Sequence, residues 1–203
     1  MVLRRRQRRV LTDVARVFST VCNPFVTALV LFVVISHRSS RSIPEFWTLL
    51  AISTLFTSIG PMLYVFYLYA NDKISDLDMS VRAERQRVFS GFVISYTSGT
   101  LALLLVHAPP IMTATMGGYA AASIVTQAIT RSWKISTHAL GITAPIVVML
   151  YLYGREPLPF VVLVPIVGWS RVYLKAHTLR QVLAGTGLGL GSTLLMFRVF
   201  HLV

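Results

Sequence analysis

Long apolar runs separated by short polar segments repeat along almost the whole chain of 203 residues. A helix needs about 20 apolar residues to cross the hydrocarbon core of a bilayer. By that criterion the pattern predicts seven membrane spans, at 17–36, 46–69, 89–107, 110–130, 138–153, 158–170 and 181–200. Two of these runs, 138–153 and 158–170, are short for a full crossing. The expected fold is therefore an all-α, polytopic transmembrane helical bundle with six to seven spans.

The overall composition supports a membrane protein. Hydrophobic residues make up 55% of the chain, charged residues only 13%, and the mean hydropathy is +0.68. Ordinary soluble domains carry about 25% charged residues. We expect residues 17–203 to form a single membrane-embedded domain, preceded by a basic N-terminal segment at 1–16. The one cysteine, Cys22, excludes a disulfide within the chain.

The positive charge of the chain is unevenly distributed between the two ends of the predicted bundle. The formal net charge is +12. With seven spans, all lysines and arginines lie on the side of the N-terminus except Arg38, Arg41, Arg155 and Arg198. Since positive loops stay in the cytoplasm, the N-terminus and its side of the bundle are expected to be cytoplasmic. The basic residues form short blocks between apolar runs, so the expected partners are membrane lipids and an anionic lipid substrate, with no nucleic acid. The sequence leaves the oligomeric state open.

Three polar loops, at 70–88, 131–137 and 171–180, are predicted to emerge at the same end of the bundle. The loops predicted at the other end, 37–45 and 154–157, are short and contain few groups suited to catalysis. We therefore expect any chemistry to occur at the end that carries the N-terminus.

The last of these loops, "SRVYLKAHTLRQ", combines a fixed cation with a potential nucleophile. The planar guanidinium of Arg171 suits two oxygens of a phosphate, and the neutral imidazole of His177 can attack phosphorus. The two residues are six apart, so they converge only if the helix ends or bends between them. Gln181 lies four residues after His177, where its amide would hold the ring if both share a helical face. The loop is equally compatible with a cationic juxtamembrane segment that has an interfacial histidine.

The middle loop, "RSWKISTHALG", precedes a predicted span. Ser136 or Thr137 can cap that helix, whose free N–H groups would favour an anion. His138 would then lie at the mouth of the site, where it could protonate a leaving oxygen. The alternative is a purely structural cap followed by an interfacial histidine.

The first loop, "NDKISDLDMSVRAERQR", mixes acids with Lys73, Arg82, Arg85 and Arg87. On a helix Glu84 and Arg87 are i,i+3 partners, so part of this cluster is explained by ordinary ion pairing. A phosphate clamp and a solvated ion-pair network both remain open for it.

Taken together, the loops resemble a known family. "SRVYLKAH" fits the serine-arginine, five residues, histidine motif of the type 2 phosphatidic acid phosphatase superfamily, which includes bacterial acid phosphatases and vanadium haloperoxidases. "KISTHA" resembles the family's second motif, usually proline-serine-glycine-histidine. The resemblance covers about residues 70–195, and the third motif is its most specific part.

The resemblance implies a role for each residue that matches a motif. It implies that His177 is the nucleophile that becomes phosphorylated, that Arg171 binds phosphate oxygens and that His138 protonates the leaving group. The other expected phosphate-binding residues are Ser136, Thr137, Lys134, Ser170 and the group Arg82, Arg85 and Arg87, among which Arg85 is preferred. No metal and no cofactor are implied, because arginine and lysine supply the charge stabilisation.

The chain departs from the family pattern at several positions. Ile135 and Thr137 replace the usual proline and glycine of the second motif, and Gln181 replaces the acid that usually orients the nucleophilic histidine. The first motif, a lysine followed after six residues by arginine-proline, has no clean match. If Arg85 or Arg87 stands for its arginine, its lysine position falls on Asp78 or Ser80.

The expected function is that of an integral membrane lipid phosphatase, acting on a substrate such as phosphatidic acid or an isoprenyl diphosphate through a phosphohistidine. One alternative is a non-catalytic membrane protein that retains the fold. A Mg²⁺-dependent prenyltransferase would use the aspartates of "NDKISDLD", but it needs a second aspartate-rich loop, and the later loops contain no Asp. The glycines of "GTGLGLG" are expected to allow close helix packing, through the pairs Gly185/Gly189 and Gly187/Gly191.

Overall fold

The computed structural model describes residues 2–77 and 81–203, and the side chains from residue 6 onward. Within these ranges all regular secondary structure is helical, which confirms the all-α class. The elements are α1 (Val2–Val21), α2 (Pro24–Ser39), α3 (Ile43–Thr54), a π-helical turn (Leu55–Ile59), α4 (Gly60–Ala70), α5 (Arg82–Leu105), α6 (Pro110–Thr130), α7 (Thr137–Tyr153), a 3₁₀ turn (Leu158–Val162), α8 (Leu163–Tyr173) and α9 (Leu179–Val199). Asp78 and Ser80, the candidate lysine positions of the first motif, lie outside the described residues.

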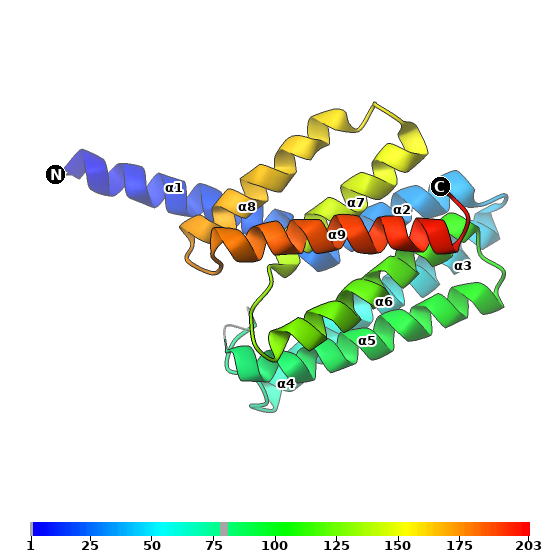
Figure 1. Ribbon diagram of the computed structural model, residues 1–203, viewed down its shortest axis with the longest axis horizontal. Helices are drawn as coiled ribbons and strands as arrows, with labels where there is room; N and C mark the ends of the chain where they lie inside the picture. The colour runs from blue at the N-terminus through cyan, green and yellow to red at the C-terminus, as the bar shows by residue number, and fades with distance from the viewer. Residues whose placement is uncertain (1, 78–80) are drawn as a thin grey trace.

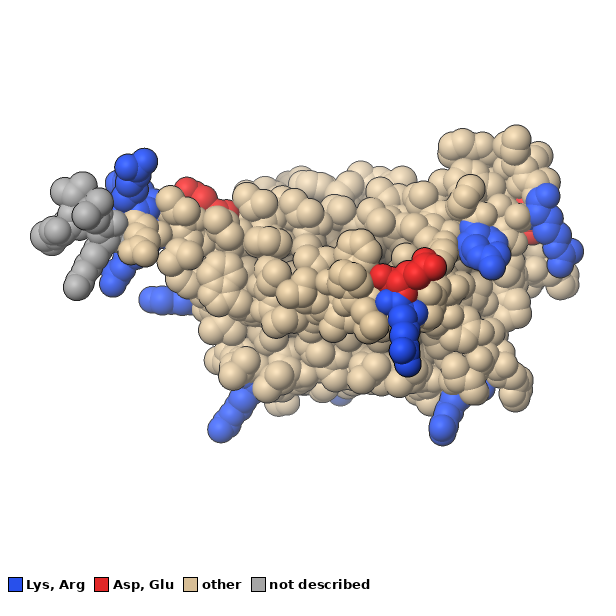
Figure 2. All heavy atoms as spheres, turned by 90° about the horizontal axis from the view of Figure 1, so that it is seen from above, with Lys and Arg blue, Asp and Glu red and all other residues tan. Residues whose placement is uncertain are grey.

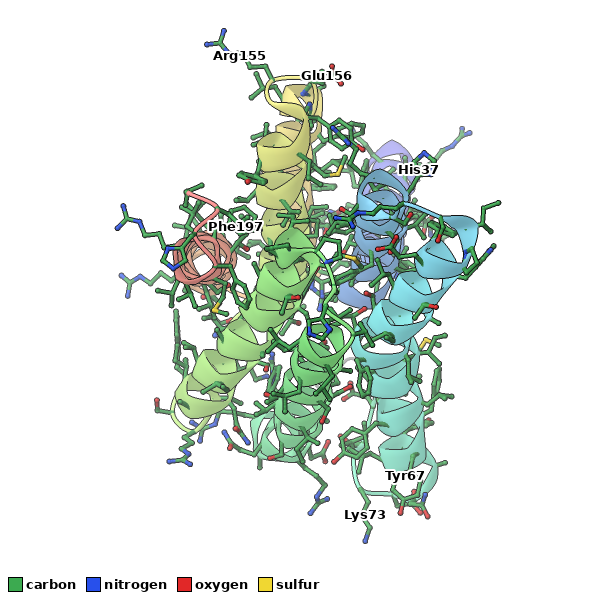
Figure 3. The ribbon with its side chains drawn as sticks, turned by 90° about the vertical axis from the view of Figure 1, so that its right-hand side faces the viewer. His37, Tyr67, Lys73, Arg155, Glu156 and Phe197 are labelled. Atoms are coloured by element: carbon green, nitrogen blue, oxygen red, sulfur yellow. The ribbon has the colours of Figure 1, made fainter. Side chains whose placement is uncertain are left out.

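The helices run roughly lengthwise along the molecule (Figure 1). The main packing partners are α5 with α6, and α9 with both α6 and α7. The segments that connect α4 to α5, α6 to α7 and α8 to α9 lie at the end from which α1 extends, as Figure 1 shows. Figure 3 labels Arg155 and Glu156, in the turn after α7, far from Lys73 in the loop after α4. The prediction that the three polar loops lie at one end is therefore confirmed.

Only part of the predicted membrane topology is confirmed. Among the described residues, three helices are long and apolar enough to cross a membrane: Ile43–Ala70, Arg82–Leu105 and Leu179–Val199. A fourth results if Arg6–Val21 and Pro24–Ser39, bent by 47°, count as one span. The helices Thr137–Tyr153 and Leu158–Tyr173 are apolar but shorter. The number of six to seven spans therefore stays a prediction.

The core of the bundle forms around α6, which is buried along most of its length. Its side chains pack with large buried residues of α2 and α5, among them Phe32, Phe89 and Leu103. On the face drawn in Figure 2, uncharged residues cover most of the surface. Many large apolar side chains are exposed, as expected for helices that face lipid rather than water. The chain is thus built as a membrane protein.

The corner between α1 and α2 is held tightly against the start of α7. Asn23 caps α2 by accepting a hydrogen bond from the Phe25 N–H at 2.9 Å, and Pro24 occupies the first helical position. Thr27 Oγ1 donates to the Gly141 carbonyl at 2.8 Å. A Cβ atom at Gly141 would lie 2.9 Å from Pro24 Cβ, so only glycine permits this approach. The end of α1 is thereby fixed relative to α7.

One of the two predicted glycine pairs packs α9 against α7. A Cβ atom at Gly185 would collide with the Ser136 carbonyl oxygen, and one at Gly189 would lie 2.8 Å from the Leu140 carbonyl oxygen. The packing role of this pair is confirmed. The role predicted for Gly187 and Gly191 is wrong, because a Cβ atom at either would meet open space. Two residues correspond to about 200° of rotation along a helix, so this pair lies on the other side of α9.

Candidate active site

The chain reverses direction between Arg171 and His177. Helix α8 ends at Tyr173, and the N–H groups of Ala176 and His177 both donate to the Arg171 carbonyl, at 3.0 and 3.1 Å. Lys175 adopts a positive φ of 57° in this turn. The predicted helix end between the two residues is confirmed, and the turn carries His177 back toward Arg171.

Gln181 holds the His177 ring in one tautomer. The Gln181 Oε1 atom lies 3.1 Å from both the Thr178 backbone nitrogen and His177 Nδ1. A backbone N–H can only donate, so the Gln181 atom that faces it is the oxygen. The same oxygen therefore requires the proton of a neutral His177 ring to sit on Nδ1, which leaves the Nε2 lone pair available for attack.

The contact between Gln181 and His177 is confirmed, but the predicted shared helical face is wrong. His177 precedes Thr178, the N-cap residue of α9, and is not part of the helix. Gln181 is the third residue of α9 and forms a capping box with Thr178, whose side chain accepts from the Gln181 N–H at 3.4 Å. The amide reaches His177 because the capping box directs it back toward the N-terminus of the helix.

The environment of His177 keeps its imidazole neutral near pH 7. Burial lowers the pKa of His177, the hydrogen bond to Gln181 raises it, and the positive charges of Arg85, Arg171 and Lys134 lower it again, so that the pKa is about 4. A neutral imidazole is the form in which the ring acts as a nucleophile.

The start of α7 places His138 beside His177. Ser136 caps α7 by accepting from the Ala139 N–H at 3.3 Å, which confirms the predicted cap. The Ser136 N–H donates to the Gln181 carbonyl at 3.1 Å and joins α7 to α9. His138 follows within the first turn of α7 and is 9% exposed. Its Nδ1 atom has no hydrogen-bond partner among the described residues, so it is available to a substrate.

Two buried arginines from different helices face the histidines. Arg85 of α5 is 3% exposed and donates from Nη2 to the Ile135 carbonyl at 3.1 Å, with its guanidinium 5.4 Å from the centre of the Phe89 ring. Arg171 of α8 is 5% exposed and donates from Nη1 to Ser19 Oγ at 2.6 Å. The described residues around the cavity include no carboxylate, and buried positive charges attract an anion strongly.

The candidate site is a cavity with two arms that meet at the histidines. The basic vestibule, of about 490 Å³, is also bordered by Arg16, Lys134 and Lys175. The aromatic slot, of about 90 Å³, is formed largely by Phe25, Phe89, Phe92, Tyr96 and Tyr119. The residues that border both arms are Asn23, Arg85, His138, Arg171 and His177. This junction offers a polar side for a phosphate and an apolar side for a hydrocarbon chain.

Not all of the predicted phosphate-binding residues come together. Arg82 donates to the Arg131 carbonyl at 3.1 Å, and Arg87 donates to the Lys73 carbonyl at 3.0 Å. Neither side chain borders the vestibule or the slot. Ser170 is buried and donates to the Val167 carbonyl at 2.8 Å. The Ser136 hydroxyl is used as a helix cap. Of the remaining predicted residues, Lys134 borders the vestibule and Thr137 borders the slot.

The residues contributed by the end of α1 were not predicted from the sequence. Arg16, Ser19 and Asn23 border the vestibule, and no motif or composition signal distinguishes them. The slot did have a signal: Arg85, Phe89, Phe92 and Tyr96 follow the i, i+4, i+7, i+11 spacing of one helical face. Among the described residues, no group of three or more His, Cys, Asp and Glu side chains is arranged to hold a metal ion.

The comparisons with known proteins bear on the second half of the chain. Residues 105–203 match the family model described as the PAP2 superfamily. No curated protein and no solved structure matches the chain. The matched region contains His138, Arg171, His177 and Gln181, whereas Ser19 and Arg85 precede it.

Proposed function

We propose that this chain, which belongs to the type 2 phosphatidic acid phosphatase (PAP2) superfamily, is an integral membrane lipid phosphatase that uses His177 as its nucleophile. The substrate is a lipid phosphomonoester, such as phosphatidic acid, or an isoprenyl diphosphate. One observation carries this proposal: a neutral imidazole, fixed by Gln181, lies where a basic vestibule meets an aromatic slot.

In the first step of the proposed reaction, the phosphate occupies the junction beside Arg85 and Arg171. His177 Nε2 attacks phosphorus, forming a P–N bond while the P–O bond to the lipid breaks. The departing oxygen takes a proton from the imidazolium form of His138, which the negative charge of the bound phosphate favours. The guanidinium groups offset the negative charge that the phosphoryl oxygens carry in the transition state.

In the second step, water attacks the phosphorus of the phosphohistidine. His138, which lost its proton in the first step, accepts one from this water. The P–N bond breaks, its electron pair returns to Nε2, and inorganic phosphate is released. Both histidines then regain their starting states.

The aromatic slot supports a lipid rather than a soluble phosphate ester as substrate. A water-sized group requires about 10–15 Å³ of such cavity space, so a slot of about 90 Å³ accommodates roughly six to nine methylene-sized groups. That is enough for the first part of a hydrocarbon tail. The vestibule, in contrast, has the charge to attract an anionic head group and to release a hydrated phosphate ion.

The proposal includes a topology. Residues 17–203 form one membrane-embedded domain with six to seven spans, and the end with the vestibule faces the cytoplasm, together with residues 1–16. The excess of lysine and arginine at that end supports this orientation.

Phosphate release by the detergent-purified chain in EDTA tests the proposal. A panel of phosphatidic acid, an isoprenyl diphosphate and a short-chain alkyl phosphate should include at least one substrate, vanadate should inhibit the reaction, and His177→Asn should abolish it. His107→Asn is the matched control, since His107 is exposed at the end of α5 and borders neither arm. If the folded protein releases phosphate from no member of the panel, the proposal fails and the chain is a non-catalytic member of the fold.

A further inference from the structure

We propose that Ser19, in the last turn of α1, is a positioning residue that orients the Arg171 guanidinium for catalysis. This inference rests on the proposed function for its kinetic consequences. It extends the active site to a part of the chain that lies outside the region matched by the family model.

The contact that carries the inference is short and buried. The Ser19 hydroxyl accepts a hydrogen bond from Arg171 Nη1 at 2.6 Å, and the two residues are 152 positions apart in the chain. Ser19 is 8% exposed and Arg171 5% exposed. Hydrogen bonds that involve a charged partner are about twice as strong as neutral ones, and a low local dielectric strengthens them further. Ser19 therefore restrains the direction of the guanidinium plane.

The same residue also contacts the second candidate catalytic group. The backbone of Ser19 lies beside the His138 ring. The hydroxyl thus contacts Arg171, while the main chain lies next to His138. A substitution of the Ser19 side chain affects the first contact and leaves the second in place.

The end of α1 is held firmly enough to act as a reference point. Helix α1 packs against α8, the helix that carries Arg171. Two turns of α1 and its corner direct Arg16, Ser19, Thr20 and Asn23 toward the vestibule, at the i, i+3, i+4, i+7 spacing of one face. The Asn23 cap and the contact between Pro24 and Gly141 fix this corner against α7. Ser19 is consequently placed by packing and not by Arg171 alone.

Loss of the Ser19 hydroxyl should act mainly on the transition state. The arginine side chain would remain in the cavity, but it would lose the buried hydrogen bond that helps to hold its N–H groups in the direction that two phosphoryl oxygens require. We therefore expect kcat to fall while KM for the lipid changes little, because the tail binds elsewhere.

Kinetics of Ser19→Ala, with Ser58→Ala as the matched control, tests the inference. Ser58 is also buried, and its hydroxyl donates to the distant Phe25 carbonyl at 2.8 Å without bordering the cavity. Ser19→Ala should lower kcat about ten- to a hundredfold, change KM less than about threefold, and weaken vanadate inhibition in parallel. Ser19→Thr, which keeps the hydroxyl, should restore most of the rate, and Ser58→Ala should behave as wild type.

Two further measurements distinguish a failure of this inference from a loss of folding and from a failure of the proposed function. Ser19→Cys fills the same space with a poor acceptor, so it should show the loss even if Ser19→Ala melts early. If the wild-type protein hydrolyses nothing, calorimetric binding of vanadate, which mimics the transition state, replaces kinetics, and Ser19→Ala should weaken it about tenfold. Wild-type kcat and vanadate inhibition in folded Ser19→Ala, or unchanged vanadate binding in the second case, would overturn the inference.

Discussion

The two halves of the chain contribute different kinds of residue to one cavity. The C-terminal half, which matches the family model, supplies both histidines, Arg171 and Gln181. The N-terminal half supplies Arg85, the Ser19 contact and most of the aromatic side chains of the slot. The reacting groups thus belong to the recognisable half, while the unmatched half surrounds them with charge and apolar surface. A family motif identifies the proposed chemistry, but the substrate environment is formed by helices that the motif does not include.

Substitution of Arg85 is expected to reduce activity the most. Arg85→Gln should lower kcat/KM by about a hundred- to a thousandfold, because it removes a buried cation that faces the phosphate. Arg87→Gln, two residues further along the same helix, should change it less than about threefold, because Arg87 binds the Lys73 carbonyl away from the cavity. Steady-state phosphate release measures both. Equal losses of kcat/KM in the two variants would show that Arg85 has no specific role in catalysis.

A smaller effect is expected at Gln181, in the matched half. Gln181→Ala should lower kcat about ten- to thirtyfold, because the His177 tautomer is no longer fixed and the α9 capping box is lost. The melting temperature in detergent separates the second cause from the first.

Gln181→Glu converts the same contact into the carboxylate that the family usually has. In the wild type the His177 pKa is about 4, so the acid limb of the kcat/KM profile, where protonation removes the Nε2 lone pair, should lie near that value. A carboxylate stabilises the imidazolium and raises the pKa of His177, so the acid limb should move to higher pH. An unchanged pH profile in Gln181→Glu would mean that the residue does not control His177.

The smallest effect is expected in the aromatic slot. Ala122→Leu narrows the slot and should lower kcat/KM for a long-chain lipid phosphate about three- to tenfold. The same variant should hydrolyse a short-chain alkyl phosphate at nearly the wild-type rate, which also controls for folding. If both substrates lose activity equally while the protein remains folded, the slot does not bind the tail.

The sequence predicted those features that depend on local pattern. The apolar runs predicted the helical class, and the spacing of Arg171 and His177 showed that the two converge only if the helix ends or bends between them. The number of spans did not follow, because α6 fills the centre of the bundle with threonine, serine and glycine as well as apolar residues. Which of Arg82, Arg85 and Arg87 reaches the cavity depends on the face of α5 that points inward. The sequence positions of three closely spaced arginines do not show which face this is.

Ser19 illustrates a different kind of feature that the sequence does not reveal. A lone serine in an apolar helix has no signature, and its partner lies 152 residues away. Only the packing of α1 against α8 brings the two together. The role of Gln181, in contrast, depends on a local capping box. Gln181 follows Thr178 by three residues in the sequence, which is the spacing that a capping box requires.

Trapping the covalent intermediate tests whether the phosphoryl group passes through His177. The purified protein is mixed with substrate, quenched in alkali, in which phosphohistidine survives, and digested for mass spectrometry. The account predicts one phosphoryl group on His177, absent from His177→Asn and more abundant in His138→Ala when the substrate has a good leaving group. Turnover with no trapped phosphoryl group, or with the group on another residue, would contradict it.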